Sequence, residues 1–222
     1  MGNPNPSISE LATKRAERIV QACLNLYGVI KLADLVAVHN WYEQAPISME
    51  ELKSIIKKMS DYAEGNLFLR YNILSNALFD LQDPDDYQMA KDILAKQANK
   101  PRYLPKKDEF LKYVDEDYVE PMESLLELER FIIKNRLVPF ANPEDIRFDV
   151  LELHDQVVFD EPIDNYTVYL NKRGYKFDSE IQVKALFALI MNVHNHTRMM
   201  ENNGHTPLET HALFVTKNST DA

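Results

Sequence analysis

The sequence predicts a mainly α-helical protein in two parts: a winged-helix-like unit of three helices plus a small β-hairpin, then an acidic helical domain. Three observations predict this. Apolar residues recur at helical spacing along most of the 222 residues. Only 5 Gly accompany 11 Pro, and many of the prolines follow a residue that can cap a helix. The negative charge is concentrated after residue 80.

The first 80 residues are predicted to form the winged-helix-like unit. Helices are expected over 7–27 and 31–43, and a third begins at Ser48, which forms a capping-box pair with Glu51. A strand over 67–73, a turn at Ser75-Asn76 and a short return through 77–79 complete the pattern. In a winged helix the third helix reads nucleic acid and the hairpin is the wing. The same order of elements also arises as ordinary packing, and this alternative stays open.

Residues 81–215 are predicted to form the acidic helical domain, followed by a flexible tail over 216–222. Helices are expected over 84–98, 106–115, 118–135, 143–159, 165–171 and 179–200. The 179–200 segment is apolar nearly all round, which is typical of a buried helix. We therefore expect it to be the central helix of this domain.

Charge separates the two parts and limits the partners that each can bind. Residues 1–80 hold 8 Lys/Arg and 9 Asp/Glu, a net of -1, whereas residues 81–222 hold 17 and 26, a net of -9. Because a nucleic-acid-binding surface must neutralise phosphates, nucleic acid is expected only on residues 1–80. The acidic remainder is expected to meet a protein partner.

Several classes of protein are excluded or disfavoured by the sequence. No apolar run approaches the ~18 residues of a membrane span, and the first residues lack the pattern of a signal peptide. The single cysteine, Cys23, excludes an intramolecular disulfide and a multi-cysteine zinc site. No phosphate-binding loop, nucleophile elbow or dinucleotide fingerprint occurs. We expect a non-enzymatic, cytoplasmic binding or regulatory protein with no cofactor, no catalytic residue and no membrane contact.

Three short stretches carry a resemblance to a family. They are 26–30, with Leu32 and Leu35 following; 103–105 with 109–113; and 195–199 leading into 204–209. Together they resemble uncharacterised proteins of Firmicutes and their mobile elements, many of which end in a cysteine-rich, zinc-binding SEC-C motif. The resemblance spans about residues 7–214 and implies a helical body and a cytoplasmic location, but no activity. The sequence departs from the pattern after Phe214, where no cysteine follows.

One group of basic residues is suited to phosphate. Lys53 and Lys57 are one turn apart on the expected third helix, Lys58 is adjacent, and Arg70 lies on the expected wing. The alternative interpretation is a solvated helix face, because Glu50 and other acidic residues are interspersed.

A second group lies near the C-terminus and supports an alternative function. Asn195, Arg198 and His205 are candidates for a polar binding patch, and His196 with His205 for a weak metal site. This patch would serve a metal-assisted or polar-site enzyme. A structural explanation is also sufficient for 204–209: Gly204 turns the chain, and a capping box starts the next helix.

Overall fold

The computed structural model describes residues 8–62 and 67–220. Within them the protein is mainly helical, with ten α-helices, two short 3-10 helices and one three-stranded antiparallel sheet. No helix in the described part of the chain combines the length and apolar character that a membrane crossing requires. The chain divides into two compact units, Met1–Tyr118 and Val119–Ala222, which are described separately.

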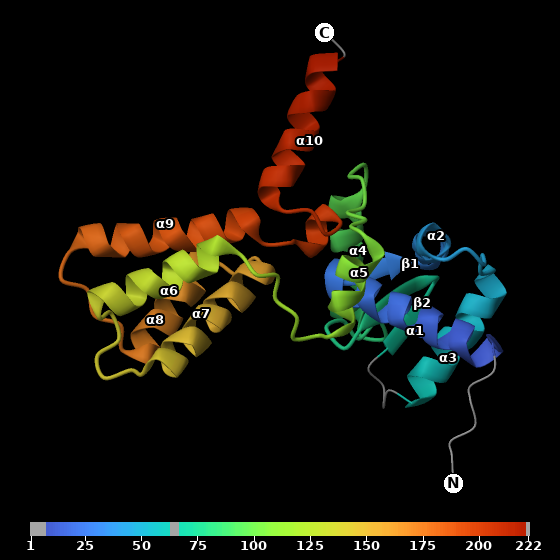
Figure 1. Ribbon diagram of the computed structural model, residues 1–222, viewed down its shortest axis with the longest axis horizontal. Helices are drawn as coiled ribbons and strands as arrows, with labels where there is room; N and C mark the ends of the chain where they lie inside the picture. The colour runs from blue at the N-terminus through green and yellow to red at the C-terminus, as the bar shows by residue number, and fades with distance from the viewer. Residues whose placement is uncertain (1–7, 63–66, 221–222) are drawn as a thin grey trace. The chain divides into compact units, whose positions relative to one another are not determined.

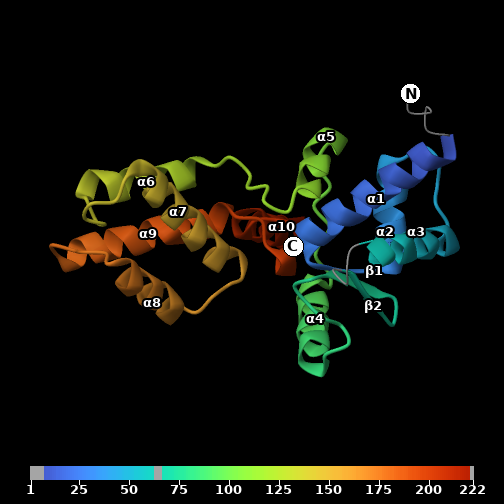
Figure 2. The same cartoon turned by 90° about the horizontal axis from the view of Figure 1, so that it is seen from below.

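The first unit places its sheet among helices that are close in sequence (Figures 1 and 2). Its elements are α1 (Ile8–Tyr27), β1 (Val29–Lys31), α2 (Leu32–Tyr42), α3 (Met49–Tyr62), β2 (Leu67–Arg70), β3 (Ile73–Asn76), α4 (Pro84–Gln97), α5 (Lys107–Phe110) and η1 (Leu111–Val114). The three helices and the hairpin expected in residues 1–80 are therefore present. Gly65-Asn66, which the sequence predicts as the end of the third helix, lies outside the described residues.

The hairpin was predicted correctly in kind, but its turn was predicted at the wrong residues. The turn lies at Tyr71-Asn72, where both residues have positive φ (49° and 61°), and not at Ser75-Asn76. Ser75 lies inside β3, paired with Val29 and with Phe68. A two-residue turn with positive φ at both positions matches the right-handed twist of the strands that it joins, and this favours the register observed.

The strand β1 was not predicted, and it gives the sheet its third member. It pairs with β3, so that the strand order is β1-β3-β2. Three residues between two helices are too short for a periodic signal. The strand forms because Val29 and Ile30 are fully buried and their backbone groups pair with β3.

The core of the first unit shows why this unit extends past residue 80. The residues that are buried in it come mostly from α1, α2 and α3, but Phe110 and Tyr113 belong to the same cluster. The phenol of Tyr27 donates a 2.7 Å hydrogen bond to the carbonyl of Tyr103, and Gln97 donates one to the carbonyl of Tyr27. The boundary thus falls at 118/119 and not at 80/81, because 81–118 completes the first core.

The second unit is a set of helices that run beside one another (Figure 1). Its elements are α6 (Glu123–Asn135), α7 (Pro143–Val158), α8 (Ile163–Arg173), α9 (Glu180–His196), η2 (Met200–Asn202) and α10 (Pro207–Thr220). The core contains Leu128 and Ile132 of α6, Val150 of α7, and Leu186 and Ile190 of α9. Helix α10 turns away from α9 and runs to Thr220, so the expected tail over 216–222 is helical as far as Thr220.

Helix α9 differs from the expectation in two ways. It ends at His196 instead of Met200, because Thr197 takes an extended conformation and its hydroxyl donates to the carbonyl of Val193. It also buries one stripe only: Leu186 is fully buried, whereas Ile181 is 78% exposed. Helix α9 therefore lies along the bundle and is not surrounded by it.

Candidate nucleic-acid interface

The orientation of α3 is set by its cap and its apolar face. The hydroxyl and backbone N–H of Ser48 both donate to the carboxylate of Glu51, whose own N–H donates back to the Ser48 hydroxyl at 3.2 Å. Leu52 and Ile56 are buried in the core of the first unit. The opposite face carries Lys53, Lys57 and Lys58, all exposed, as the sequence pattern predicts.

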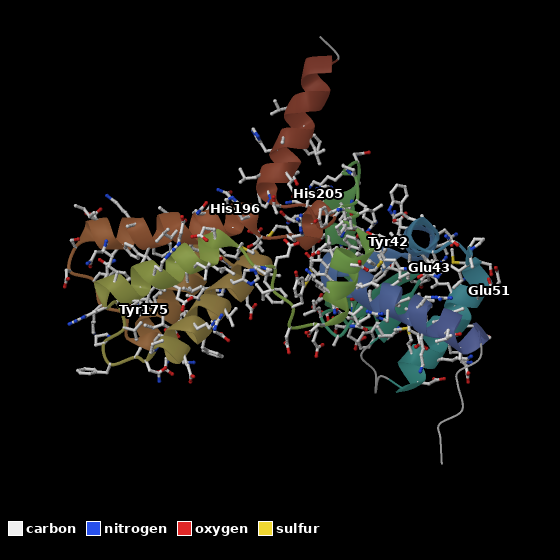
Figure 3. The ribbon with its side chains drawn as sticks, in the orientation of Figure 1. Tyr42, Glu43, Glu51, Tyr175, His196 and His205 are labelled. Carbon is white, nitrogen blue, oxygen red and sulfur yellow. The ribbon has the colours of Figure 1, made fainter. Side chains whose placement is uncertain are left out.

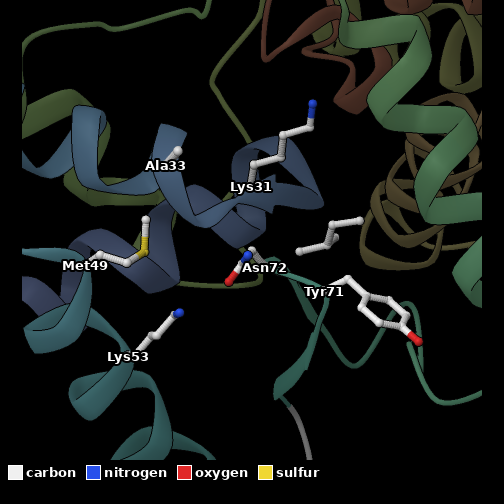
Figure 4. A pocket seen from close by; sticks show the side chains of 7 residues that line it. Lys31, Ala33, Met49, Lys53, Tyr71 and Asn72 are labelled. Atoms are coloured by element: carbon white, nitrogen blue, oxygen red, sulfur yellow. The ribbon is translucent and has the colours of Figure 1, made fainter.

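A hollow of about 330 Å³ lies where α3 meets the start of α2 and the β2–β3 turn (Figure 4). It is lined by Lys31, Ala33, Met49, Lys53, Tyr71, Asn72 and Ile73. The N–H of Leu32, the first residue of α2, donates a 2.9 Å hydrogen bond to the carbonyl of Asn72. This bond ties the helix start to the turn and holds two walls of the hollow together.

The lysines at this surface keep their charges available. Among residues 8–62 and 67–220, the side-chain ammonium groups of Lys31, Lys53, Lys57 and Lys58 have no hydrogen-bond or ion-pair partner. Such groups can bind an anion without first breaking a contact in the protein.

Two of the acidic side chains near these lysines in the sequence have partners within the first unit. Asp34 pairs with Arg102 at 3.3 Å, and Glu51 serves the α3 cap. The hydrogen bonds from Ser48 hold the pKa of the Glu51 carboxyl below its ordinary value, so the cap carboxylate stays ionised. These pairings reduce the competition that acidic side chains would offer to a bound anion.

Arg70 is placed differently from the lysines with which the sequence grouped it. Its guanidinium donates a 2.8 Å hydrogen bond to the carbonyl of Leu81 and lies 4.5 Å from the ring centroid of Tyr87 and 5.3 Å from that of Tyr71. Arg70 thus joins the hairpin to α4 through Tyr87, and its guanidinium is already engaged in contacts within the protein.

Sequence reasoning missed Lys31, Tyr71 and Asn72, which line the hollow with Lys53. Their position depends on strand β1 and on the place of the turn, and both were unrecognised. The signal that could have found them is the dipeptide Tyr71-Asn72 between two apolar runs, because asparagine tolerates the positive φ of a two-residue hairpin turn.

The polar group predicted near the C-terminus is brought together only in part. Arg198 is 14% exposed; its Nε lies 3.1 Å from the carboxylate of Glu120, and its Nη1 donates to Glu209 at 2.7 Å and to the carbonyl of Gly204 at 3.2 Å. His205 Nδ1 donates to the same Glu209 carboxylate at 3.2 Å. Among the described residues, Asn195 takes no part in these bonds.

This arrangement is the capping box that the sequence offered as the structural explanation. The N–H of Thr206 donates to the Glu209 carboxylate, and the N–H of Glu209 donates to the Thr206 hydroxyl, both at 3.1 Å. Burial alone would raise the pKa of Glu209, but the hydrogen bonds from Arg198, Thr206 and His205 outweigh it and hold that pKa below its ordinary value. Glu209, ionised at neutral pH, fixes Arg198 and the start of α10.

The two histidines proposed as a weak metal site have separate partners. His196 is exposed and its Nδ1 donates a 2.8 Å hydrogen bond to the carbonyl of Asn192, whereas His205 Nδ1 faces Glu209 (Figure 3). Each ring could therefore offer only Nε2 to a metal ion. The part of the chain that the structure describes contains no group of three or more His, Cys, Asp or Glu side chains that could hold a metal ion.

No family model matches this chain, and neither a curated protein nor a solved structure matches it. The resemblance to Firmicutes proteins stays a prediction, and the functional conclusion rests on the geometry of the hollow and its lysines.

Proposed function

We propose that the first unit is a winged-helix-like module that binds nucleic acid through α3, the start of α2 and the β2–β3 turn. The order α1-β1-α2-α3-β2-β3 supports this proposal, as does the addition of β1 to the hairpin along β3. In such modules the third helix is presented to the nucleic acid and the hairpin lies beside it. Here α3 and the hairpin turn border one hollow.

The observation that carries the proposal is a set of lysines at and beside this hollow whose ammonium groups have no partner among the described residues. Lys31 and Lys53 line it, and Lys57 is one turn further along α3. Phosphate contacts from exposed lysines supply most of the affinity of a protein for nucleic acid without regard to base sequence.

The charge of the whole unit sets the expected strength of binding. Residues 1–118 hold 15 Lys/Arg and 18 Asp/Glu, a net of -3, and Glu50 and Asp61 are exposed on α3 itself. An interaction that depends on a few cations within an acidic unit is weak and falls steeply as salt increases.

The test uses the full chain and a fluorescein-labelled DNA duplex of roughly 20 base pairs. The binding affinity is measured by fluorescence anisotropy at about 50 mM and about 200 mM salt. Reversing two charges in Lys53→Glu/Lys57→Glu is expected to lower the affinity at least about tenfold at the lower salt, and to reduce the salt slope by about two.

The matched control is Lys172→Glu/Lys176→Glu, which changes the net charge by the same amount at exposed lysines of the second unit. It is expected to bind nearly as the wild type does. Equal losses in both double variants would show that only total charge matters, and would contradict the assignment of the site to α3.

A second candidate function, binding of a protein partner by the second unit, is favoured by a specific observation. Phe148 of α7 and Ile163 and Val168 of α8 are large apolar side chains that are more than half exposed, and exposed apolar side chains that form a contiguous patch mark an interaction site. Phe148→Ser/Ile163→Ser is expected to lose a partner that co-purifies with the wild-type chain. The same partner retained by the variant would exclude these two helices as its binding site.

A further inference from the structure

The residue that stands out at the edge of the hollow is Tyr71. It has a φ of 49° at the first position of a two-residue hairpin turn, and its side chain is 75% exposed. Asparagine, aspartate and glycine are the residues that such a turn favours, and Asn72 follows that preference. A bulky tyrosine with positive φ is a genuine outlier, and burial of its ring cannot account for it.

The ring is nevertheless held in place from one side. The Arg70 guanidinium lies 5.3 Å from its centroid, and the Tyr87 ring lies 5.9 Å away at an interplanar angle of 54°. Arg70 is itself fixed by Leu81, and Lys91 stands 5.3 Å from the Tyr87 centroid. Tyr71 is therefore an oriented aromatic surface that remains largely open to solvent.

The turn separates this aromatic surface from the cationic hollow. Figure 4 shows the Tyr71 ring extending away from Lys53, while the Asn72 amide lies on the side of Lys53 and Met49. A ligand that spans the turn meets ammonium groups on one side and an aromatic face on the other. A nucleotide combines an anion with a flat π-face, and so matches both sides at once.

We propose that Tyr71 stacks on an unpaired nucleobase of a strand whose phosphates are bound by Lys31 and Lys53. This inference rests on the proposed nucleic-acid-binding function and names its substrate class: a single strand or an unpaired duplex end. In an intact duplex the faces of the bases are stacked on one another and only their edges reach the grooves. Aromatic side chains that bind single strands stack on any base, because every base has a π-face.

In this proposal Arg70 is a positioning residue. Its guanidinium holds the Tyr71 ring in place and contacts Leu81 and Tyr87 within the protein. The phosphates are bound by the lysines instead.

The experiment compares the full-length wild type with Tyr71→Asn and Tyr71→Trp. Asparagine favours the positive φ of this position, so the hairpin is retained while the ring is lost. Tryptophan keeps an aromatic face. The probes are a single-stranded oligonucleotide of about 12 nucleotides that contains 2-aminopurine, and a blunt duplex of the same sequence.

The expected result is specific to the unpaired probe. The wild type and Tyr71→Trp should quench the 2-aminopurine fluorescence, and Tyr71→Asn should bind the single strand about tenfold more weakly without quenching. Affinity for the blunt duplex should be the same in all three proteins. Circular dichroism should show equal folded populations.

The outcomes separate this inference from the proposed function. If Tyr71→Asn binds and quenches as the wild type does, the stacking role is overturned, while a loss of duplex binding in Lys53→Glu/Lys57→Glu still supports the proposed function. If Lys53→Glu/Lys57→Glu binds as tightly as the wild type, the assignment of the phosphate site to these lysines is wrong. If quenching still requires the Tyr71 ring in that case, the stacking role of Tyr71 is retained. If the wild-type chain binds neither probe, both are overturned.

Discussion

Two lysines of α3 and two arginines of the second unit are used in opposite ways. Lys53 and Lys57 lie on an exposed helix face with no partner among the described residues. Arg198 and Arg173 instead meet carboxylates of their own unit, at Glu209 and Asp149. The difference teaches that position within the fold, and not residue type, decides whether a cation stabilises the protein or remains available to a ligand.

The largest effect should come from the most deeply buried of these carboxylates. Asp149 is fully buried on α7 and accepts hydrogen bonds from the Tyr169 hydroxyl at 2.9 Å, the Arg173 guanidinium at 2.5 Å and the Tyr175 hydroxyl at 3.4 Å. Burial, and then the neighbouring carboxylate, raise the pKa of Tyr175, so its hydroxyl stays protonated and able to donate.

We therefore expect Asp149→Ala to lower the free energy of unfolding of the second unit by about 3 kcal/mol, since three donors lose their acceptor. Urea denaturation, monitored by hydrogen exchange of the backbone amides in each helix, would measure this loss in the free energy of unfolding. Asp155→Ala, an exposed carboxylate of the same helix, is the control and should change stability by less than about 0.5 kcal/mol. Equal effects would mean that the Asp149 network contributes nothing special.

A smaller loss is expected at the start of α10. Arg198→Ala removes one guanidinium from Glu120, Gly204 and Glu209 and should cost about 2 kcal/mol, because the two carboxylates are partly exposed and can be rehydrated. Arg198→Lys keeps the charge but not the forked guanidinium donor, so its free energy of unfolding should lie between those of the wild type and Arg198→Ala. If Arg198→Ala is as stable as the wild type, the ion pairs of Arg198 do not stabilise the second unit.

Acidification should also destabilise the start of α10, by less than Arg198→Ala does. The folded-state pKa of Glu209 is depressed, so its contribution is present above the ordinary value of 4.5 and is lost as pH falls through the lower folded-state value. The urea midpoint of the wild type should therefore approach that of Glu209→Gln between about pH 5 and about pH 3. A constant difference between the two proteins over this range would be inconsistent with the depressed pKa.

The smallest effect on stability is expected where the cations are unpaired. Lys53→Ala/Lys57→Ala should change the free energy of unfolding by less than about 0.5 kcal/mol, because both side chains are exposed and no hydrogen bond or ion pair in the described residues is lost. The affinity for the duplex should nevertheless fall. A marked destabilisation would show that these lysines serve the fold, and would end the contrast with Arg198.

The local elements could be predicted from sequence because they are encoded within a few residues. The capping pairs Ser48/Glu51 and Thr206/Glu209 form as expected, and Asn142-Pro143 starts α7 through a capping box with Asp145. Burial of Cys23, Leu186 and Ile190 likewise follows from apolar spacing.

Pairings between distant residues were decided only by the tertiary structure. Strand β1 exists because β3 lies beside it, and the first unit extends to residue 118 because Phe110 and Tyr113 complete its core. Whether a charge is free also depends on such contacts: the same sequence pattern suggested Lys53 and Arg70 together, yet Arg70 meets Leu81 and Lys53 meets solvent. The physical reason is that caps and apolar stripes involve residues three or four apart, whereas strand pairing and ion pairing involve residues that only the folded chain brings together.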